Sequence, residues 1–212
     1  MKIATQRLLT AMTLSACLGA GLSACAPIIM GGAVMGGLMA TDRRTSGMQV
    51  EDEGIELRAG NGIRSQLGER GHVNVTSYNR QVLLTGEVLN AQDKQAVEQL
   101  VSKVENVRSI VNELGVLENT TLSQRTSDTL VTGKVKATML DAKDLFANAF
   151  KVVTERGTVY LMGRVTQREA NRATELTRGI EGVKKVVRVM EIISEEELQR
   201  IQPPPAPTEV KK

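Results

Sequence analysis

An internal repeat is the feature that most constrains how this chain of 212 residues can fold. The segment Val82–Val88 (VLLTGEV) matches Val159–Val165 (VYLMGRV) at an offset of 77 residues, and Val104–Val111 matches Ile180–Val187 at an offset of 76. The units of solenoid proteins are about 20 to 50 residues long. The longer offset therefore indicates a duplicated small domain rather than a solenoid.

Both copies show the same order of patterns: helix, strand, strand, helix, strand. We expect helices at 54–67, 91–103, 128–140 and 167–178, and strands at 73–77, 81–85, 108–114, 150–154, 158–162 and 184–192. The first two strands of each copy are separated by Tyr78–Arg80 or Glu155–Gly157, short turns that contain Asn or Gly. We therefore predict an α+β fold with two tandem αββαβ domains, 51–118 and 124–193, each a small sheet with two helices on one face.

The start of the chain has the composition of a bacterial lipoprotein signal. Lys2 and Arg7 precede an apolar run, Leu8–Leu22, and the run closes on Leu22-Ser23-Ala24-Cys25. We expect residues 1–24 to be removed and Cys25 to carry the lipid. Two alternatives stand beside this one: an uncleaved membrane span within residues 8–40, and cleavage before Cys17, which would leave a shorter apolar core than signals usually have.

Two segments outside the repeats have biased compositions. Residues 25–50 are apolar and glycine-rich, and we interpret them as a tether; the spacing of Gly31-Gly32 and Gly36-Gly37 also fits a helix-packing motif of small residues. Residues 194–212 include Pro203-Pro204-Pro205-Ala206-Pro207. We expect this tail to be disordered or to act as a weak docking segment.

Composition excludes several classes of function. The chain has no Trp, two Phe and two Tyr, so its core must be aliphatic, and its net charge is only +3. A nucleic-acid-binding protein would normally be more basic and would carry stacking aromatics. His72 is the only histidine, and no HExxH, P-loop or GxSxG motif is present. We therefore expect no enzyme activity, no cofactor and no metal site.

Charge is divided unequally between the two copies. Residues 51–118 hold 7 Lys and Arg against 11 Asp and Glu, a net charge of −4, whereas residues 124–193 hold 13 against 8, a net charge of +5. Each Lys or Arg close to an anionic bilayer contributes about 1 kcal/mol to its attraction. The second copy is therefore the better candidate for contact with anionic lipid headgroups.

The first helix of the second copy offers a face for such a contact. At helical spacing, Val131, Val135 and Met139 form a stripe that we assign to the core, and Ser127 and Asp128 are candidates to cap the helix. The opposite face carries the candidate phospholipid-binding residues Leu130, Lys134, Lys136, Ala137 and Leu140. An exposed leucine beside lysines suits binding at a membrane interface. Alternatively, Leu130 packs against the first copy and the lysines are only solvated.

The repeated motifs resemble those of the BON domain family. The strand motif Val-x-Leu-x-Gly-x-Val occurs in both copies, and Gly86 and Gly163 are its structural glycines; the ending Val-x-x-Val-x-x-Val-x-Asn occurs at Val104–Asn112, whereas the second copy has Arg188 in place of the Asn. Ala26 after the cysteine, where Asp would mark retention in the inner membrane, implies the outer membrane by resemblance to such lipoproteins.

The resemblance implies a non-enzymatic protein, anchored by lipid at the periplasmic face of the outer membrane, that maintains envelope integrity. Its second domain is implied to bind anionic phospholipids such as phosphatidylglycerol and cardiolipin, and enrichment at the division site is a further implication. The alternative is a scaffold that binds envelope-assembly or division proteins, with lipid contact incidental. The acidic first copy and the Pro-rich tail favour that alternative.

Overall fold

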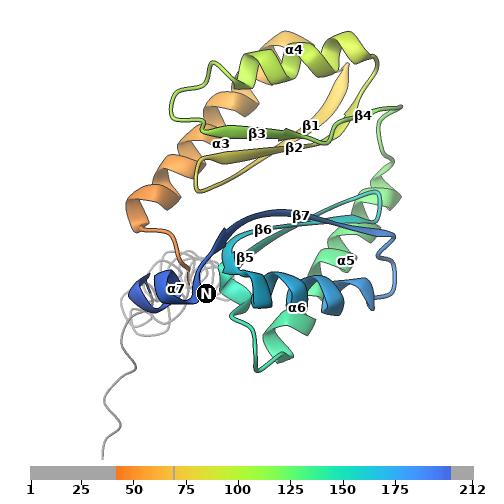
Figure 1. Cartoon of the computed structure of the whole chain (residues 1–212). Helices are drawn as coiled ribbons and strands as arrows, with labels where there is room; N and C mark the ends of the chain where they lie inside the picture. The colour runs from red at the N-terminus through yellow and green to blue at the C-terminus, as the bar shows by residue number, and fades with distance from the viewer. Residues whose placement is uncertain (1–41, 69, 202–212) are drawn as a thin grey trace, which may run out of the picture. The chain divides into compact units, whose positions relative to one another are not determined.

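The computed structural model describes residues 42–68 and 70–201, and two αββαβ units follow one another along this part of the chain (Figure 1). The first comprises helix α3 (Ser46–Leu67), strands β1 (Gly71–Tyr78) and β2 (Gln81–Val88), helix α4 (Ala91–Val101), and strands β3 (Ser109–Asn112) and β4 (Gly115–Val116). The second comprises α5 (Leu122–Asp141), the short 3-10 helix η2 (Ala147–Ala149), β5 (Phe150–Glu155), β6 (Thr158–Thr166), α6 (Gln167–Arg178), β7 (Lys185–Ile193) and α7 (Glu195–Ile201). The predicted α+β fold with two αββαβ domains is confirmed.

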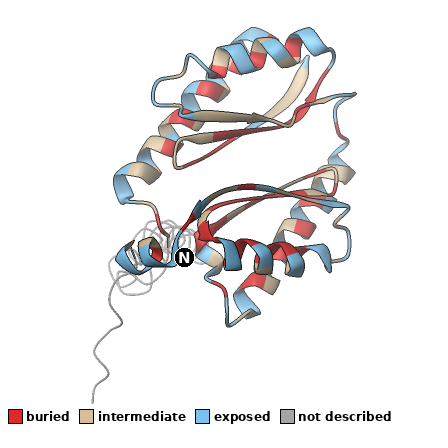
Figure 2. Ribbon diagram, viewed as in Figure 1, coloured by how far each residue is buried: buried red, intermediate tan, exposed pale blue. Residues whose placement is uncertain are grey.

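Each sheet is mixed and is built around the strand that carries the repeated motif. Strand β2 pairs antiparallel with β1 and parallel with β3 and β4, and β6 pairs in the same way with β5 and β7. The hairpins close where Tyr78 faces Gln81 and Glu155 faces Thr158, so each turn has two residues between the strands. The central strands are the most deeply buried, because strands cover both of their edges and side chains cover both of their faces (Figure 2).

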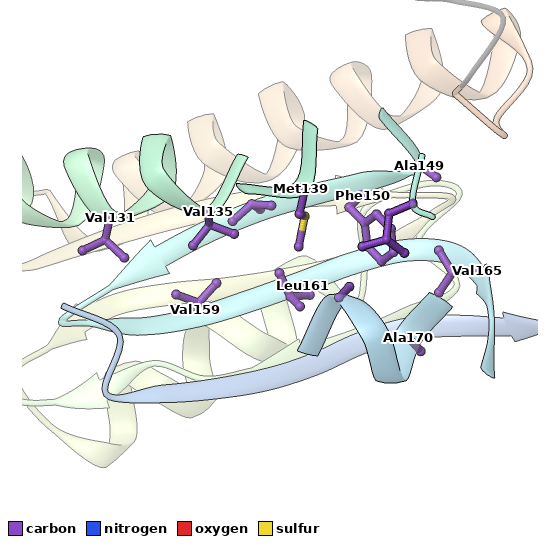
Figure 3. Packing of buried hydrophobic residues seen from close by; sticks show 12 residues of the cluster. Val131, Val135, Met139, Ala149, Phe150, Val159, Leu161, Val165 and Ala170 are labelled. Atoms are coloured by element: carbon purple, nitrogen blue, oxygen red, sulfur yellow. The ribbon is translucent and has the colours of Figure 1, made fainter. Parts of the chain in front are cut away.

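The helices of each unit lie on one face of its sheet and enclose an aliphatic core (Figure 1). In the second unit, Val131, Val135 and Met139 point from α5 towards Val159 and Leu161 of β6 (Figure 3). The predicted core stripe of α5 is therefore confirmed. The matching cluster of the first unit holds residues from α3, α4 and β2, namely Ile55, Ala59, Ile63, Leu67, Val82, Leu84, Val88, Val97 and Val101.

The opposite faces of the two sheets contribute to a third cluster. Because side chains alternate along a strand, Leu83 of β2 and Tyr160 and Met162 of β6 point away from their own helices. They are buried together with Tyr78 and Val189. The tyrosines, two of the few aromatic residues in the chain, therefore lie in this cluster rather than in either helix-covered core.

A buried aspartate on the first helix of each unit holds the turn of its hairpin. The carboxylate of Asp52 accepts hydrogen bonds from the backbone N–H groups of Asn79 and Arg80, both at 2.8 Å. Asp128 accepts the corresponding bonds from Arg156 and Gly157, also at 2.8 Å. The four turn residues have φ between 51° and 77°, as two-residue hairpin loops of type I′ require.

The predicted start of the first helix in the second copy, at residue 128, is wrong. Helix α5 begins at Leu122, six residues earlier than expected, and its N-cap is Thr121, whose side chain accepts a hydrogen bond from the backbone of Gln124. Asp128 is buried within the helix and binds the turn instead of capping the helix. Helix α3 likewise begins at Ser46, capped by Thr45, so the folded part starts before the predicted boundary at residue 51.

The predicted tether and tail also differ from the prediction in those of their residues that the structure describes. Arg43, assigned to the tether, is buried and forms a bidentate ion pair with Glu169 of α6, with both distances at 2.7 Å. The tail expected to be disordered from residue 194 instead begins with α7, which buries Leu198 and pairs Glu197 with Arg164 at 2.6 Å. The signal, Cys25, the tether up to residue 41 and the tail after residue 201 lie outside the described residues.

Both motif glycines lie where a side chain would collide with the neighbouring strand segment. A Cβ at Gly86 would overlap the backbone oxygen of His72, and one at Gly163 would overlap that of Ala149. Gly86 also has φ of 105°, in a region that L-residues rarely adopt. The glycines are therefore structural.

We predict that Gly86→Ala lowers the free energy of unfolding by about 2 kcal/mol or more, since it adds both backbone strain and a collision. Gly133→Ala on α5 is the control, because an added Cβ there meets no atom within 4 Å. It should raise stability by about 0.5–1 kcal/mol, as expected for an exposed helix position. Urea denaturation of both variants measures the difference, and equal stability would contradict the structural role of Gly86.

The buried aspartate predicts a loss of stability in acid. Burial opposes the ionisation of Asp52, but hydrogen bonds from Arg80, Ser77, Arg44 and Asn79 outweigh it and lower its pKa. A carboxylate with a lowered pKa stabilises the fold above its unfolded pKa of about 3.9, and this contribution is lost as the pH falls through the folded pKa.

Asp52→Asn should therefore be less stable than the parent at pH 7, by about 1 kcal/mol or more. The difference should shrink as the pH falls below about 4, towards and through the lowered pKa of Asp52. The exposed Asp141 serves as the control, and Asp141→Asn should follow the parent at every pH. Thermal unfolding against pH tests this; a constant gap between Asp52→Asn and the parent would contradict it.

Candidate functional site

The outer face of α5 is an exposed apolar strip. Leu122, Leu130 and Leu140 have 80%, 64% and 67% of their surface exposed, whereas Val131 and Val135 on the inner face are buried. At about 100° per residue, Leu122 and Leu140 project in one direction, and Ala137 and Leu130 lie about 60° and 80° further round the helix. Exposed apolar side chains thus recur along this face of the helix, with Thr126, Thr129 and Gly133 between them.

Lysines border the strip on both sides. Lys134 lies about 40° beyond Leu130, and Lys136 lies about 40° beyond Leu140 on the other edge. The Nζ of Lys134 is 3.0 Å from the carboxylate of Glu181, an exposed pair that contributes little to stability. Lys136 has no ion-pair partner among the described residues. The side chains of the five predicted site residues are therefore all exposed, and they lie on one face of the helix.

The loop before β7 adds positive charge beside this helix. A Cβ on Gly182 would touch Val131 of α5, and one on Gly157 would touch the side chain of Lys184, so the loop lies against the helix and the hairpin turn. Lys184 in that loop and Lys185 at the start of β7 are exposed. The positive charge of the second domain is therefore partly gathered near α5.

The equivalent face of α3 has different residues at the positions of Leu130, Ala137 and Leu140. At the repeat offset of 76, Leu130, Ala137 and Leu140 correspond to Gly54, Asn61 and Arg64. The capping threonine and the turn-binding aspartate are the same in both helices. The two helices therefore share a scaffold but carry their exposed apolar residues at different positions: α5 at 122, 130, 137 and 140, and α3 at Val50 and Leu57, which are 67% and 64% exposed.

A second group of polar residues was missed by the sequence interpretation. His72, Glu87 and Glu155 each offer an atom that could bind a metal ion, and these atoms all lie within 4.8 Å of one another. Burial and the positive charge of Arg125 lower the pKa of His72. Burial and the negative charge of Glu87 raise the pKa of Glu155.

Part of this group could have been found from the sequence. The hairpin register places His72 opposite Glu87, and the predicted turn defines that register. Glu155 belongs to the other repeat, and no local pattern brings it to the pair.

None of the helices in the described residues is long and apolar enough to cross a bilayer.

Known proteins contain the same domains, and two of them align with most of this chain. The model of the BON domain matches residues 61–118 and 127–194. The outer membrane lipoprotein DolP of Haemophilus influenzae is 37% identical over 174 residues, which cover 81% of this chain and 90% of that protein. The 21 kDa hemolysin of Actinobacillus pleuropneumoniae is 32% identical over 154 residues, or 72% of this chain and 79% of that protein.

Among solved structures, the type III secretion protein CdsD of Chlamydia trachomatis is 15% identical and covers 66% of this chain and 95% of its own. The TM-score of this match is 0.29. The family match spans more than half of the chain, and the first relative extends over most of it. The chain belongs to the BON domain family and is an outer-membrane lipoprotein with two such domains.

Proposed function

We propose that this lipoprotein binds anionic phospholipid through the outer face of α5 and thereby helps to maintain the outer membrane. The observation that carries the proposal is the exposed strip of Leu122, Leu130, Ala137 and Leu140 with a lysine on each edge. A surface helix binds a membrane when it combines an apolar face with basic residues at its border. The proposed role is one of binding.

The expected affinity of this face is modest. Full burial of a leucine side chain contributes about 1.5–3 kcal/mol, and each lysine near an anionic surface about 1 kcal/mol. Leucines that reach only the headgroup region contribute less than full burial would. The helix should therefore bind and release lipid reversibly, and phosphatidylglycerol or cardiolipin would be favoured over neutral lipid.

The expected anchor at Cys25 would strengthen this weak contact. Sixteen residues, 26–41, separate Cys25 from the described part of the chain, and a fully extended stretch of that length reaches at most about 55 Å. A lipidated chain would therefore keep residue 42, and the domains that follow it, near the bilayer. The resulting local concentration favours occupancy of a site that would be weak for a free domain.

Replacing the central leucine tests the proposed face. Leu130→Glu puts a charge into the apolar strip, and we expect it to lower the binding of unlipidated residues 26–212 to phosphatidylglycerol vesicles at least tenfold. Leu57→Glu on α3 is the matched control, because Leu57 is also 64% exposed on the equivalent helix of the first domain. Sedimentation with vesicles at low salt measures both.

Equal binding of the two variants, or no sedimentation of the parent, would contradict the proposed site. If lipid binding is absent and crosslinking at α5 in cells recovers one dominant protein, the alternative of a protein-binding scaffold gains support instead.

Removing the ion-pair partner of Lys134, Glu181, should strengthen lipid binding rather than weaken it. Glu181→Gln frees this lysine from its ion pair, so binding to anionic vesicles should strengthen about fivefold, in line with one additional lysine near the surface. The control is Glu175→Gln on α6, which changes the net charge equally and breaks a pair with Arg172 instead. Vesicle titrations at two salt concentrations compare them; the same gain in both variants would show an effect of net charge alone.

A further inference from the structure

We propose that His72, Glu87 and Glu155 form a Zn²⁺ site that links the two BON domains. His72 and Glu87 belong to the hairpin of the first domain, and Glu155 ends strand β5 of the second. Their potential ligand atoms lie within 4.8 Å of one another. This site is separate from the α5 face and does not depend on the proposed lipid contact.

The three side chains already converge. The Nδ1 of His72 and the Oε2 of Glu87 are 3.6 Å apart, close to the separation of two ligands of one tetrahedral Zn²⁺ ion, which binds N and O atoms at about 2.0–2.2 Å. The Nδ1 atom is buried and has no hydrogen-bond partner. A buried nitrogen without a partner is unfavourable, and a bound metal ion would remove this cost.

Neighbouring groups hold the carboxylates in place. Asn74 donates a hydrogen bond to Glu155 at 3.0 Å, and the backbone N–H and hydroxyl of Thr120 donate to Oε2 of Glu87, both at 3.2 Å. Such outer contacts orient metal ligands in known sites. Arg156 binds the other oxygen of Glu87, Oε1, at 2.6 Å and so fixes the orientation of this carboxylate.

The types of ligand favour zinc over the other common divalent ions. Calcium and magnesium prefer sites made only of oxygen atoms, whereas one imidazole with two carboxylates suits Zn²⁺, which also accepts a water molecule as its fourth ligand. The side chain of His72 is 24% exposed, which leaves room for ion entry and for that water.

The two proposed ligands from the first domain have no counterparts in the second domain. At an offset of 77, the positions of His72 and Glu87 are occupied by Ala149 and Arg164, and Arg164 pairs with Glu191 and Glu197 instead. Since the third ligand comes from the other domain, zinc would link the domains and make their unfolding depend on metal concentration.

The experiment is a titration of the untagged mature lipoprotein in detergent with Zn²⁺ alone, after treatment with a chelator. His72 is the only histidine, and the one cysteine expected to remain carries lipid, so zinc bound through nitrogen must use His72. Calorimetry should give one ion per chain with a dissociation constant in the micromolar range, and the midpoint of thermal unfolding should rise as zinc is added.

Two variants and a control decide the outcome. His72→Ala should abolish binding, and Glu155→Gln, which keeps the shape of the side chain, should weaken it at least tenfold and remove the rise in unfolding temperature. Asp144→Asn, an exposed carboxylate outside the group, should bind like the parent. No binding by the parent, or binding that Glu155→Gln leaves unchanged, overturns the proposal; circular dichroism without metal verifies that the variants are folded.

Discussion

The structure depends first on the hydrogen bonds between a buried aspartate and the turn of the following hairpin. Asp52 and Asp128 each place a charge in the interior, and two backbone N–H groups of the turn compensate its burial. The interaction attaches the hairpin to the first helix and so determines which face of the sheet the helix covers. The alternation along β2 and β6 then sends Val82 and Leu84 to the helices and Leu83 to the opposite side.

The buried opposite faces of the sheets leave the outer faces of the helices as the surface available to partners. Ion pairs across the domains add to this arrangement: Glu56 binds Lys151 at 2.7 Å, and Arg108 binds Glu191 at 2.9 Å. The pair between Arg43 and Glu169 attaches the segment before α3 to the second domain. The residues directly before α3 are therefore attached to the domain that carries the proposed lipid-binding helix.

The two repeats show how a duplicated scaffold acquires different surfaces. The capping threonine, the turn-binding aspartate and the strand glycine occur in both, because each is required by the backbone. Exposed positions are free of that requirement and have diverged. The second domain has the apolar strip around Leu130, whereas the first has His72 opposite Glu87.

The sequence by itself determined the αββαβ order, the two hairpin turns, the core stripe of α5 and the exposed face opposite to it, because all of these follow from periods of two to four residues. It missed the first turns of α3 and α5, where polar residues hide the helical period, and the helix α7. Only the tertiary structure decided that Asp128 binds a turn, that Arg43 is buried against Glu169, and that Glu155 reaches His72. These contacts join residues far apart in the chain, so they depend on how whole elements pack, which no local pattern records.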